Sequence, residues 1–148
     1  ATGGSKPAAL SEQAYEKVCF IYARHLEALK TARRHGVTFA CGTDMFLSEC
    51  WGRNGEELRF YVDKVGMSEL EAIETATANG PLTLGESYAP RTGQLRAGYE
   101  ADIIGLSASP LGGNIGILGN PDEVLFVMKS GQVHKAVAGR GCVLYDDH

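Results

Sequence analysis

The sequence has little of what marks several common functional classes. Its 148 residues contain 14 Lys and Arg against 18 Asp and Glu, a formal net charge of −4. This acidic balance argues against a nucleic-acid partner, because nucleic-acid-binding domains usually carry a basic patch. No apolar stretch approaches the roughly 20 residues that a membrane-spanning helix needs, so we expect no membrane partner. The first residues include neither an initiator Met nor the apolar core of a signal peptide, and we therefore expect a cut end.

Cysteine and asparagine patterns exclude further classes. The four cysteines form no Cys-x-x-C pair, which argues against a zinc ribbon or a thioredoxin-like site. Cys19 and Cys41 lie inside apolar segments, and we expect them to be buried free thiols. None of the four asparagines begins an Asn-x-Ser/Thr triplet, so glycosylation sites give no support to secretion. The chain also lacks the Gly-x-Ser-x-Gly nucleophile elbow, which argues against a small serine-type α/β hydrolase.

Residues 12–35 have the pattern of one long amphipathic helix. Ser11 is suited to the N-cap, and Glu12 suits the positive end of the helix dipole. Gly36 suits the left-handed position that ends many helices. One apolar stripe recurs at three-to-four spacing and contains Ala14, Val18, Ile21, Tyr22, Leu29 and Ala32.

A short apolar run at residues 37–41 follows this helix directly. It is rich in β-forming residues and has little polar alternation, which predicts a strand buried on both faces, as in a parallel sheet. The run ends in Gly-Thr-Asp, and ligands of α/β folds bind at the carboxyl ends of strands. Asp44 is therefore the leading candidate for a catalytic acid, and the structural alternative is a carboxylate that caps the next turn.

Two helices are predicted beyond Asp44. Residues 45–55 read as a loop, in which Trp51 either lines a substrate pocket or anchors the loop. Residues 56–64 predict a short helix. Ser68 and Glu71 then form a capping box, which opens a second helix. We expect this second helix to carry four side chains inward, namely Leu70, Ile73, Ala76 and Thr77.

The last third of the chain changes to β-structure. Residues 101–106 predict a strand, and residues 124–129 and 132–135 predict a hairpin around a two-residue Ser-Gly turn. Residues 142–145 are a further strand candidate. The Gly-rich loop at residues 107–122 does not lead into a helix, so a phosphate-binding loop is not expected there.

The order of three runs carries a resemblance to a known family. The run Gly-Val-Thr-Phe-Ala-Cys-Gly-Thr-Asp at residues 36–44 is followed by helical motifs at residues 55–58 and 66–79. The run Gly-Gln-Leu-Arg-Ala-Gly-Tyr-Glu-Ala-Asp-Ile-Ile occupies residues 93–104. Together they resemble the C-terminal portion of the metal-dependent amidohydrolase superfamily, nearest to its imidazolonepropionase-like and prolidase-like members.

The resemblance implies an α/β fold that is the C-terminal part of a (β/α)₈ TIM barrel plus part of a small β-sandwich domain. Residues 1–85 would be the last helix–strand step of the barrel with its following helices, and residues 86–148 the sandwich part. The family binds zinc or another divalent metal, and Asp44 matches its last metal-ligating Asp. The implied role of Asp44 is to bind metal and to take the proton of the attacking water. The family's His-x-His pair does not occur in these 148 residues.

Two functional hypotheses follow from the sequence. In the first, the chain is the C-terminal part of a metal-dependent amidohydrolase that cleaves a small amide or dipeptide-like substrate. The isolated chain would then be inactive and bind no metal, because one carboxylate cannot replace the three protein ligands of a catalytic zinc. In the second, it is a non-catalytic interaction or scaffold module. Either way we expect it to associate with a missing N-terminal barrel portion or with itself.

Overall fold

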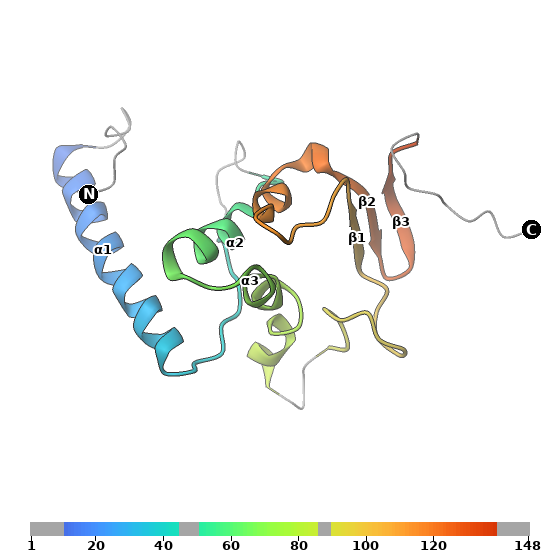
Figure 1. Ribbon diagram of the computed structural model, residues 1–148, viewed down its shortest axis with the longest axis horizontal. Coiled ribbons are helices and arrows are strands. Elements are labelled where there is room, and N and C mark those ends of the chain that lie inside the picture. Colours follow the sequence, from blue (N-terminus) through green and yellow to red (C-terminus); the bar gives the residue numbers. More distant parts are fainter. Residues whose placement is uncertain (1–10, 45–50, 86–89, 139–148) are drawn as a thin grey trace, which may run out of the picture. The chain divides into compact units, whose positions relative to one another are not determined.

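The computed structural model shows a partial α/β fold with a small sheet. The chain divides into two compact units, Ala1–Val37 and Thr38–His148. The first unit contains one helix, and the second contains the other helices and all the strands (Figure 1). The domain boundary predicted between residues 85 and 86 stays a prediction. The structure describes residues 11–44, 51–85 and 90–138.

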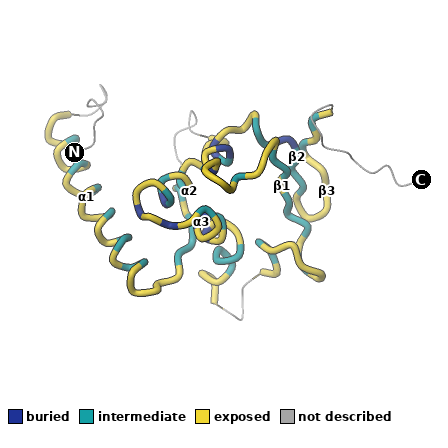
Figure 2. The backbone as a smooth tube through the Cα atoms, in the orientation of Figure 1, coloured by how far each residue is buried: buried dark blue, intermediate teal, exposed yellow. Residues whose placement is uncertain are grey.

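Helix α1 (Glu12–Arg34) begins and ends where its capping residues predict. The hydroxyl of Ser11 accepts a hydrogen bond from the amide of Ala14 at 3.2 Å. The helix ends at a His35 C-cap, and Gly36 follows with a φ of +70°. No residue of α1 is buried, and Figure 2 shows the helix only in the colours of exposed and intermediate residues.

None of the described helices is long and apolar enough to span a membrane.

The predicted strand at residues 37–41 is wrong. Within the described residues this segment is extended but joins no sheet, and Val37 is 55% exposed instead of buried. A strand is defined by hydrogen bonds to a neighbouring strand, and the backbone amide of Cys41 instead donates to the carbonyl of Thr75 at 2.8 Å. Cys19 and Cys41 form no disulfide bond, as expected, although both are partly and not fully buried.

The two helices predicted beyond Asp44 are both present. Helix α2 (Glu56–Phe60) continues into η2 (Tyr61–Val65), a π-helical turn. Helix α3 (Glu69–Ala76) begins at the predicted capping box, in which Ser68 and Glu71 bond each other's backbone amides. The predicted inward face of α3 is wrong, since its buried residues are Ala72 and Thr75 while Leu70 is 58% exposed. A 3₁₀ turn, η3 (Gly80–Leu84), follows.

The C-terminal part of the second unit forms a three-stranded antiparallel sheet in the order β1-β2-β3. Both predicted features are confirmed, the strand and the hairpin, and the hairpin turn at Ser130 and Gly131 has two positive φ angles of +48° and +78°. The candidate strand at residues 142–145 lies outside the described residues. The strands are β1 (Ile103–Leu106), β2 (Val124–Lys129) and β3 (Gln132–Ala136), and two 3₁₀ turns, η4 (Ile115–Gly119) and η5 (Pro121–Glu123), precede β2.

A small core joins the helices of the second unit to the loop before β2. Close backbone packing brings α2 and η4 together, because a side chain at Gly55 would place its Cβ 2.1 Å from the carbonyl oxygen of Leu118. Glycine at this position therefore permits a contact that any other residue would prevent. The buried residues of the core are Leu58, Tyr61, Val65, Met67, Ala72, Thr75, Ile115, Ile117 and Leu125.

Candidate functional site

Asp44 lies at the end of the extended segment that follows α1. Asp44 is exposed, and its backbone has a φ of +45°. Few residues other than glycine adopt this left-handed conformation, although Asp and Asn tolerate it better than most. The role of Asp44 in catalysis stays a prediction, since a positive φ is also common for an Asp in an ordinary turn.

Trp51 begins the next described segment and is 68% exposed. The turn behind it is braced, since Arg53 Nε donates to Glu56 Oε1 at 2.9 Å and the Glu56 amide donates to the Arg53 carbonyl at 2.9 Å. The indole ring of Trp51 is therefore presented to solvent from a well-held turn. Residues 45–50, which join Asp44 to Trp51, lie outside the described residues.

The described part of the chain does not by itself make a metal site. Among residues 11–44, 51–85 and 90–138, no three His, Cys, Asp or Glu side chains lie close enough together to hold a metal ion. Asp44 is a suitable oxygen donor, but a protein zinc site usually needs at least three protein ligands. Any metal bound by Asp44 would need further ligands from outside this part of the chain.

Cys41, three residues before Asp44 in the sequence, belongs to a polar cluster with Glu57 and Tyr61 that the sequence did not predict. The hydroxyl of Tyr61 donates to Glu57 Oε1 at 2.5 Å, and the thiol of Cys41 lies close enough to the Glu57 carboxylate for Glu57 to influence its pKa. Burial, followed by the charge of the nearby Glu57 and its hydrogen bonding, raises the pKa of Cys41 to about 12. Burial and the Glu57 hydrogen bond likewise raise the pKa of Tyr61 above its usual value. Both groups thus keep their protons at neutral pH.

The spacing of Glu57 and Tyr61 is the one sequence signal for this cluster. Residues four apart share a helix face, so these two side chains could have been paired from the sequence. The apolar pattern instead placed Tyr61 among core side chains, and it is indeed only 6% exposed. The third member, Cys41, is distant in the sequence, and only the tertiary structure brings it to Glu57.

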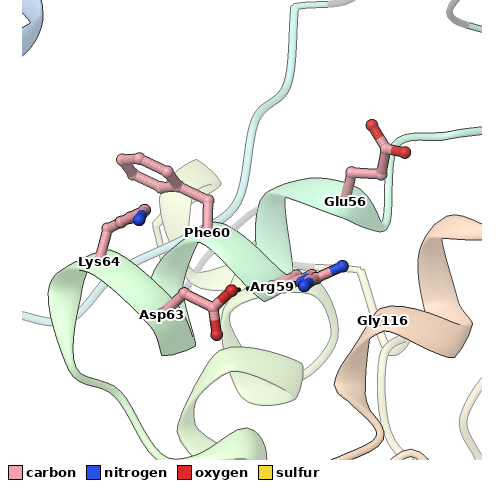
Figure 3. A pocket seen from close by; sticks show the side chains of 6 residues that line it. All are labelled: Glu56, Arg59, Phe60, Asp63, Lys64 and Gly116. Carbon is pink, nitrogen blue, oxygen red and sulfur yellow. Dashed lines mark hydrogen bonds and ion pairs between the residues drawn. The ribbon is translucent and has the colours of Figure 1, made fainter. Parts of the chain in front are cut away.

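Glu56 and Glu57 point to different partners, as expected for adjacent helical residues. Glu56 pairs with Arg53 and lines a surface hollow of about 340 Å³ beside α2 and η4. Figure 3 shows this hollow, whose other charged side chains include Arg59 and Asp63, an ion pair at 3.2 Å. A second hollow, of about 590 Å³, lies between η3 and the sheet. Neither of these two hollows is lined by Asp44 or Trp51.

Comparison with known proteins defines the class of this chain. The model of the amidohydrolase family matches residues 10–135. The chain therefore belongs to the amidohydrolase family, as the resemblance of its motifs predicts, and a hydrolytic role is supported at the level of that family.

Individual relatives lie within the same class. The chain is 43% identical over 126 residues to an ochratoxinase of Aspergillus niger, a match that covers 85% of this chain but 25% of the relative. The chain thus spans about a quarter of the length of that curated relative. The crystal structure of A. niger ochratoxinase is similar to the chain, with a TM-score of 0.74 and 42% sequence identity. The matched region covers 87% of this chain and 29% of the ochratoxinase chain.

Two further solved structures are similar to the chain. A Xaa-Pro dipeptidase with methionine bound in its active site has a TM-score of 0.70 at 26% identity, covering 86% of this chain and 29% of its own. A prolidase complexed with N-methylphosphonate-L-proline has a TM-score of 0.72 at 24% identity, covering 86% and 30%, and this likeness concerns the fold alone.

Proposed function

We propose that this chain is the C-terminal part of a metal-dependent amidohydrolase that hydrolyses an amide or peptide-like C–N bond. The observation that carries the proposal is the family match over residues 10–135, which includes the Gly-Thr-Asp sequence that ends in Asp44. In this proposal the chain supplies the last helix–strand step of a (β/α)₈ barrel and part of a β-sandwich domain. Residues 37–44 join no sheet within the described residues, which is compatible with a segment that pairs only when neighbouring barrel strands are present.

Asp44 is the residue to which we assign the chemistry. In the assembled enzyme it would be one ligand of zinc or another divalent metal, and its carboxylate would accept a proton from the attacking water. A metal at such a site lowers the pKa of bound water and polarises the scissile carbonyl. The exposed position of Asp44 leaves its carboxylate accessible to groups from outside the described residues.

Trp51 is the residue to which we assign substrate contact. Its indole ring is mostly exposed on a turn held by Arg53 and Glu56. The proposed substrate class, small amides or dipeptide-like molecules, is supported by the similarity to an ochratoxinase and to a Xaa-Pro dipeptidase.

A chimeric enzyme tests this proposal. The 126 residues of A. niger ochratoxinase that align with this chain are replaced by the chain's own residues, and hydrolysis of acyl-amino acids and dipeptides is measured with zinc added. We expect turnover, and we expect Asp44→Asn to lower kcat by about 10²–10⁴-fold, the usual contribution of a positioned acid or base. The matched control Asp122→Asn, which neutralises an exposed carboxylate on η5, should leave kcat unchanged. Full activity of Asp44→Asn would contradict the assigned role.

The chain alone gives the complementary test. With zinc added, the 148-residue protein should show no turnover of the same substrates, because its described residues supply no cluster of metal ligands. Turnover by the chain alone would overturn the view that hydrolysis needs further barrel strands.

A non-catalytic scaffold or interaction module is the second candidate. The observation that favours it is α1, which has an apolar stripe but no buried residue. Such a surface is suited to a partner, which could be a barrel portion or a second copy. An inactive chimera that still binds the remaining part of the barrel would favour this candidate.

A further inference from the structure

The segment that leads to Asp44 is held by side chains and not by a sheet. Residues 37–44 join no strand within the described residues, so no ladder of backbone hydrogen bonds determines their course. A catalytic carboxylate must nevertheless be placed accurately, since small displacements of reacting groups are costly in rate. The contacts that hold this segment are therefore candidates for a functional role.

Three contacts hold residues 39–41 against the helices of the same unit. The ring of Phe39 packs edge-on against the ring of Tyr61, with centroids 6.5 Å apart. The amide of Cys41 donates to the carbonyl of Thr75 on α3, and the Glu57 carboxylate on α2 lies close enough to the Cys41 thiol to raise its pKa. Phe39, Glu57 and Tyr61 thus form, with Cys41, one connected anchor.

The helical partner in this anchor has an unusual geometry. Glu57 lies in α2, whereas Tyr61 is the first residue of the π-helical turn η2. Such turns are rare and are found often at functional sites, where the wider turn shifts the side chains that follow. Here the hydroxyl of Tyr61 donates to Glu57 Oε1 at 2.5 Å, which ties the first residue of η2 to α2.

Protonation states keep the anchor intact at neutral pH. The pKa of Cys41 is raised to about 12, first by burial and then by Glu57, so its thiol stays a donor. The pKa of Tyr61 is raised for the same reasons. Glu57 thus accepts a hydrogen bond from Tyr61 and lies beside the thiol of Cys41, a group from a separate part of the sequence.

We propose that Glu57 and Tyr61 are positioning residues, which fix the course of the chain from Cys41 to Asp44 through the hydrogen bonds that meet at the Glu57 carboxylate. The role of Asp44 itself rests on the proposed function. The anchor does not, because it is defined by contacts among residues of this chain alone. Neither Glu57 nor Tyr61 contacts a reacting group in this proposal.

Nuclear magnetic resonance of the isotopically labelled 148-residue chain tests the anchor directly. Glu57→Gln and Tyr61→Phe should shift the backbone amide signals of residues 42–44, whereas the matched control Glu56→Gln should not. Glu56 is the adjacent carboxylate, and it hydrogen-bonds Arg53 instead. It is also one of the residues that line the surface hollow of Figure 3. Amide shifts confined to α2 and η2 would overturn the proposal.

A second pair of variants guards against a simple loss of folding. Cys41→Ser keeps a hydrogen-bond donor beside Glu57, and Cys41→Ala removes it. Both variants reduce the size of the side chain only slightly, so they differ mainly in the donor. We expect the signals of residues 42–44 to stay near their wild-type positions in Cys41→Ser and to move in Cys41→Ala. Equal shifts in both variants would show that the donor is not what holds the segment.

The chimeric enzyme separates positioning from structural support. Glu57→Gln should lower kcat by about ten- to a hundredfold with KM unchanged, because Asp44 is displaced while the substrate contacts remain. Asp122→Asn, which alters an exposed carboxylate on η5, should change neither value, and Cys41→Ser should be more active than Cys41→Ala. An unchanged kcat in Glu57→Gln would overturn the proposal. An inactive parent chimera would count against the proposed hydrolase, and the amide shifts would still decide whether the anchor exists.

Discussion

At the scale of single residues, Asp102 joins three separate parts of the β-rich region. Its carboxylate accepts hydrogen bonds from Lys129 Nζ at 2.5 Å, from the Ser130 amide at 2.8 Å and from the Thr92 hydroxyl at 3.0 Å. The hairpin turn is thereby tied to the start of β1. This explains in physical terms why an Asp occurs in the Ala-Asp-Ile-Ile motif.

The pH dependence of stability should report this carboxylate. The hydrogen bond from Lys129, followed by that from the Ser130 amide, lowers the pKa of Asp102 to about 2. A carboxyl group with a lowered folded-state pKa stabilises the fold above its unfolded pKa of about 3.9 and loses that effect as the pH falls. Asp102→Asn should therefore lower the urea midpoint at neutral pH.

The difference from wild type should then shrink as the pH falls from about 4 towards 2, where the carboxyl group becomes protonated. Asp122→Asn, which alters an exposed carboxylate, serves as the control. A difference between wild type and Asp102→Asn that stays constant over this range would contradict the role of its charge.

Two glycines of the same loop separate steric from conformational effects. Gly93 has a φ of +77°, and a Cβ there would lie 2.2 Å from the carbonyl oxygen of Thr77. Gly98 has a similar φ of +83° but has open space around the Cβ position. Gly98→Ala should thus cost about 1–2 kcal/mol for the left-handed backbone alone.

Gly93→Ala should cost about 3 kcal/mol or more, since a backbone collision is added to the same conformational cost. The free energy of unfolding of the two variants, measured in urea, checks the difference. Equal losses would mean that the loop carrying Gly93 can move away from α3 without cost.

At the scale of elements, local signals were sufficient for helices and for the hairpin. Ser11 and Ser68 accept the capping bonds that their positions predict, because a cap involves residues only three apart. The hairpin could be predicted for the same reason, because its turn is determined by residues that are neighbours in the sequence. The strand at residues 37–41 was not, since a strand exists only with a partner that local sequence does not specify, and the inward face of α3 depends on what packs against it.

The hairpin turn offers a stabilising substitution. Ser130 and Gly131 both have positive φ angles, the geometry in which Asn-Gly is strongly preferred. Ser130→Asn should raise the free energy of unfolding by about 0.5–1 kcal/mol, because Asn tolerates the left-handed region better than Ser. Thermal and urea unfolding measure the gain, and a destabilised variant would show that Ser130 has a role beyond the turn.

At the scale of the whole molecule, α1 leaves apolar surface uncovered. Val18 and Ile21, which belong to the apolar stripe of α1, are each more than half exposed. Exposed apolar surface of this kind on one helix is suited to contact with another protein surface. The chain covers only about a quarter of the ochratoxinase it resembles. We therefore expect the surface that contacts α1 to belong either to a barrel portion or to a second copy of the chain.

Light scattering on the purified chain tests this expectation. We expect a mass above the 15.8 kDa of one chain, rising with concentration. Ile21→Lys should reduce the association, whereas Ala23→Lys, which adds the same charge on the opposite side of α1, should not. A well-folded monomer at all concentrations would count against self-association and against dependence on a missing part.

The candidate site likewise has residues that the sequence predicted and residues that only the structure revealed. Asp44 and Trp51 were selected from the sequence, by their positions after an apolar run and in the following loop, and their roles stay predictions. The cluster of Glu57, Tyr61 and Cys41 became visible only in the structure, because a hydrogen bond between residues distant in the chain leaves no local pattern.

The sequence by itself determined the family, the capped helices, the hairpin turn and the choice of Asp44, since each rests on residue types at short, fixed spacings. The tertiary structure decided the contacts: which face of α3 is buried, that residues 37–44 join no sheet within the described residues, and that Glu57 lies beside both Tyr61 and Cys41. These features depend on contacts between distant segments, and packing in three dimensions is what brings such segments together.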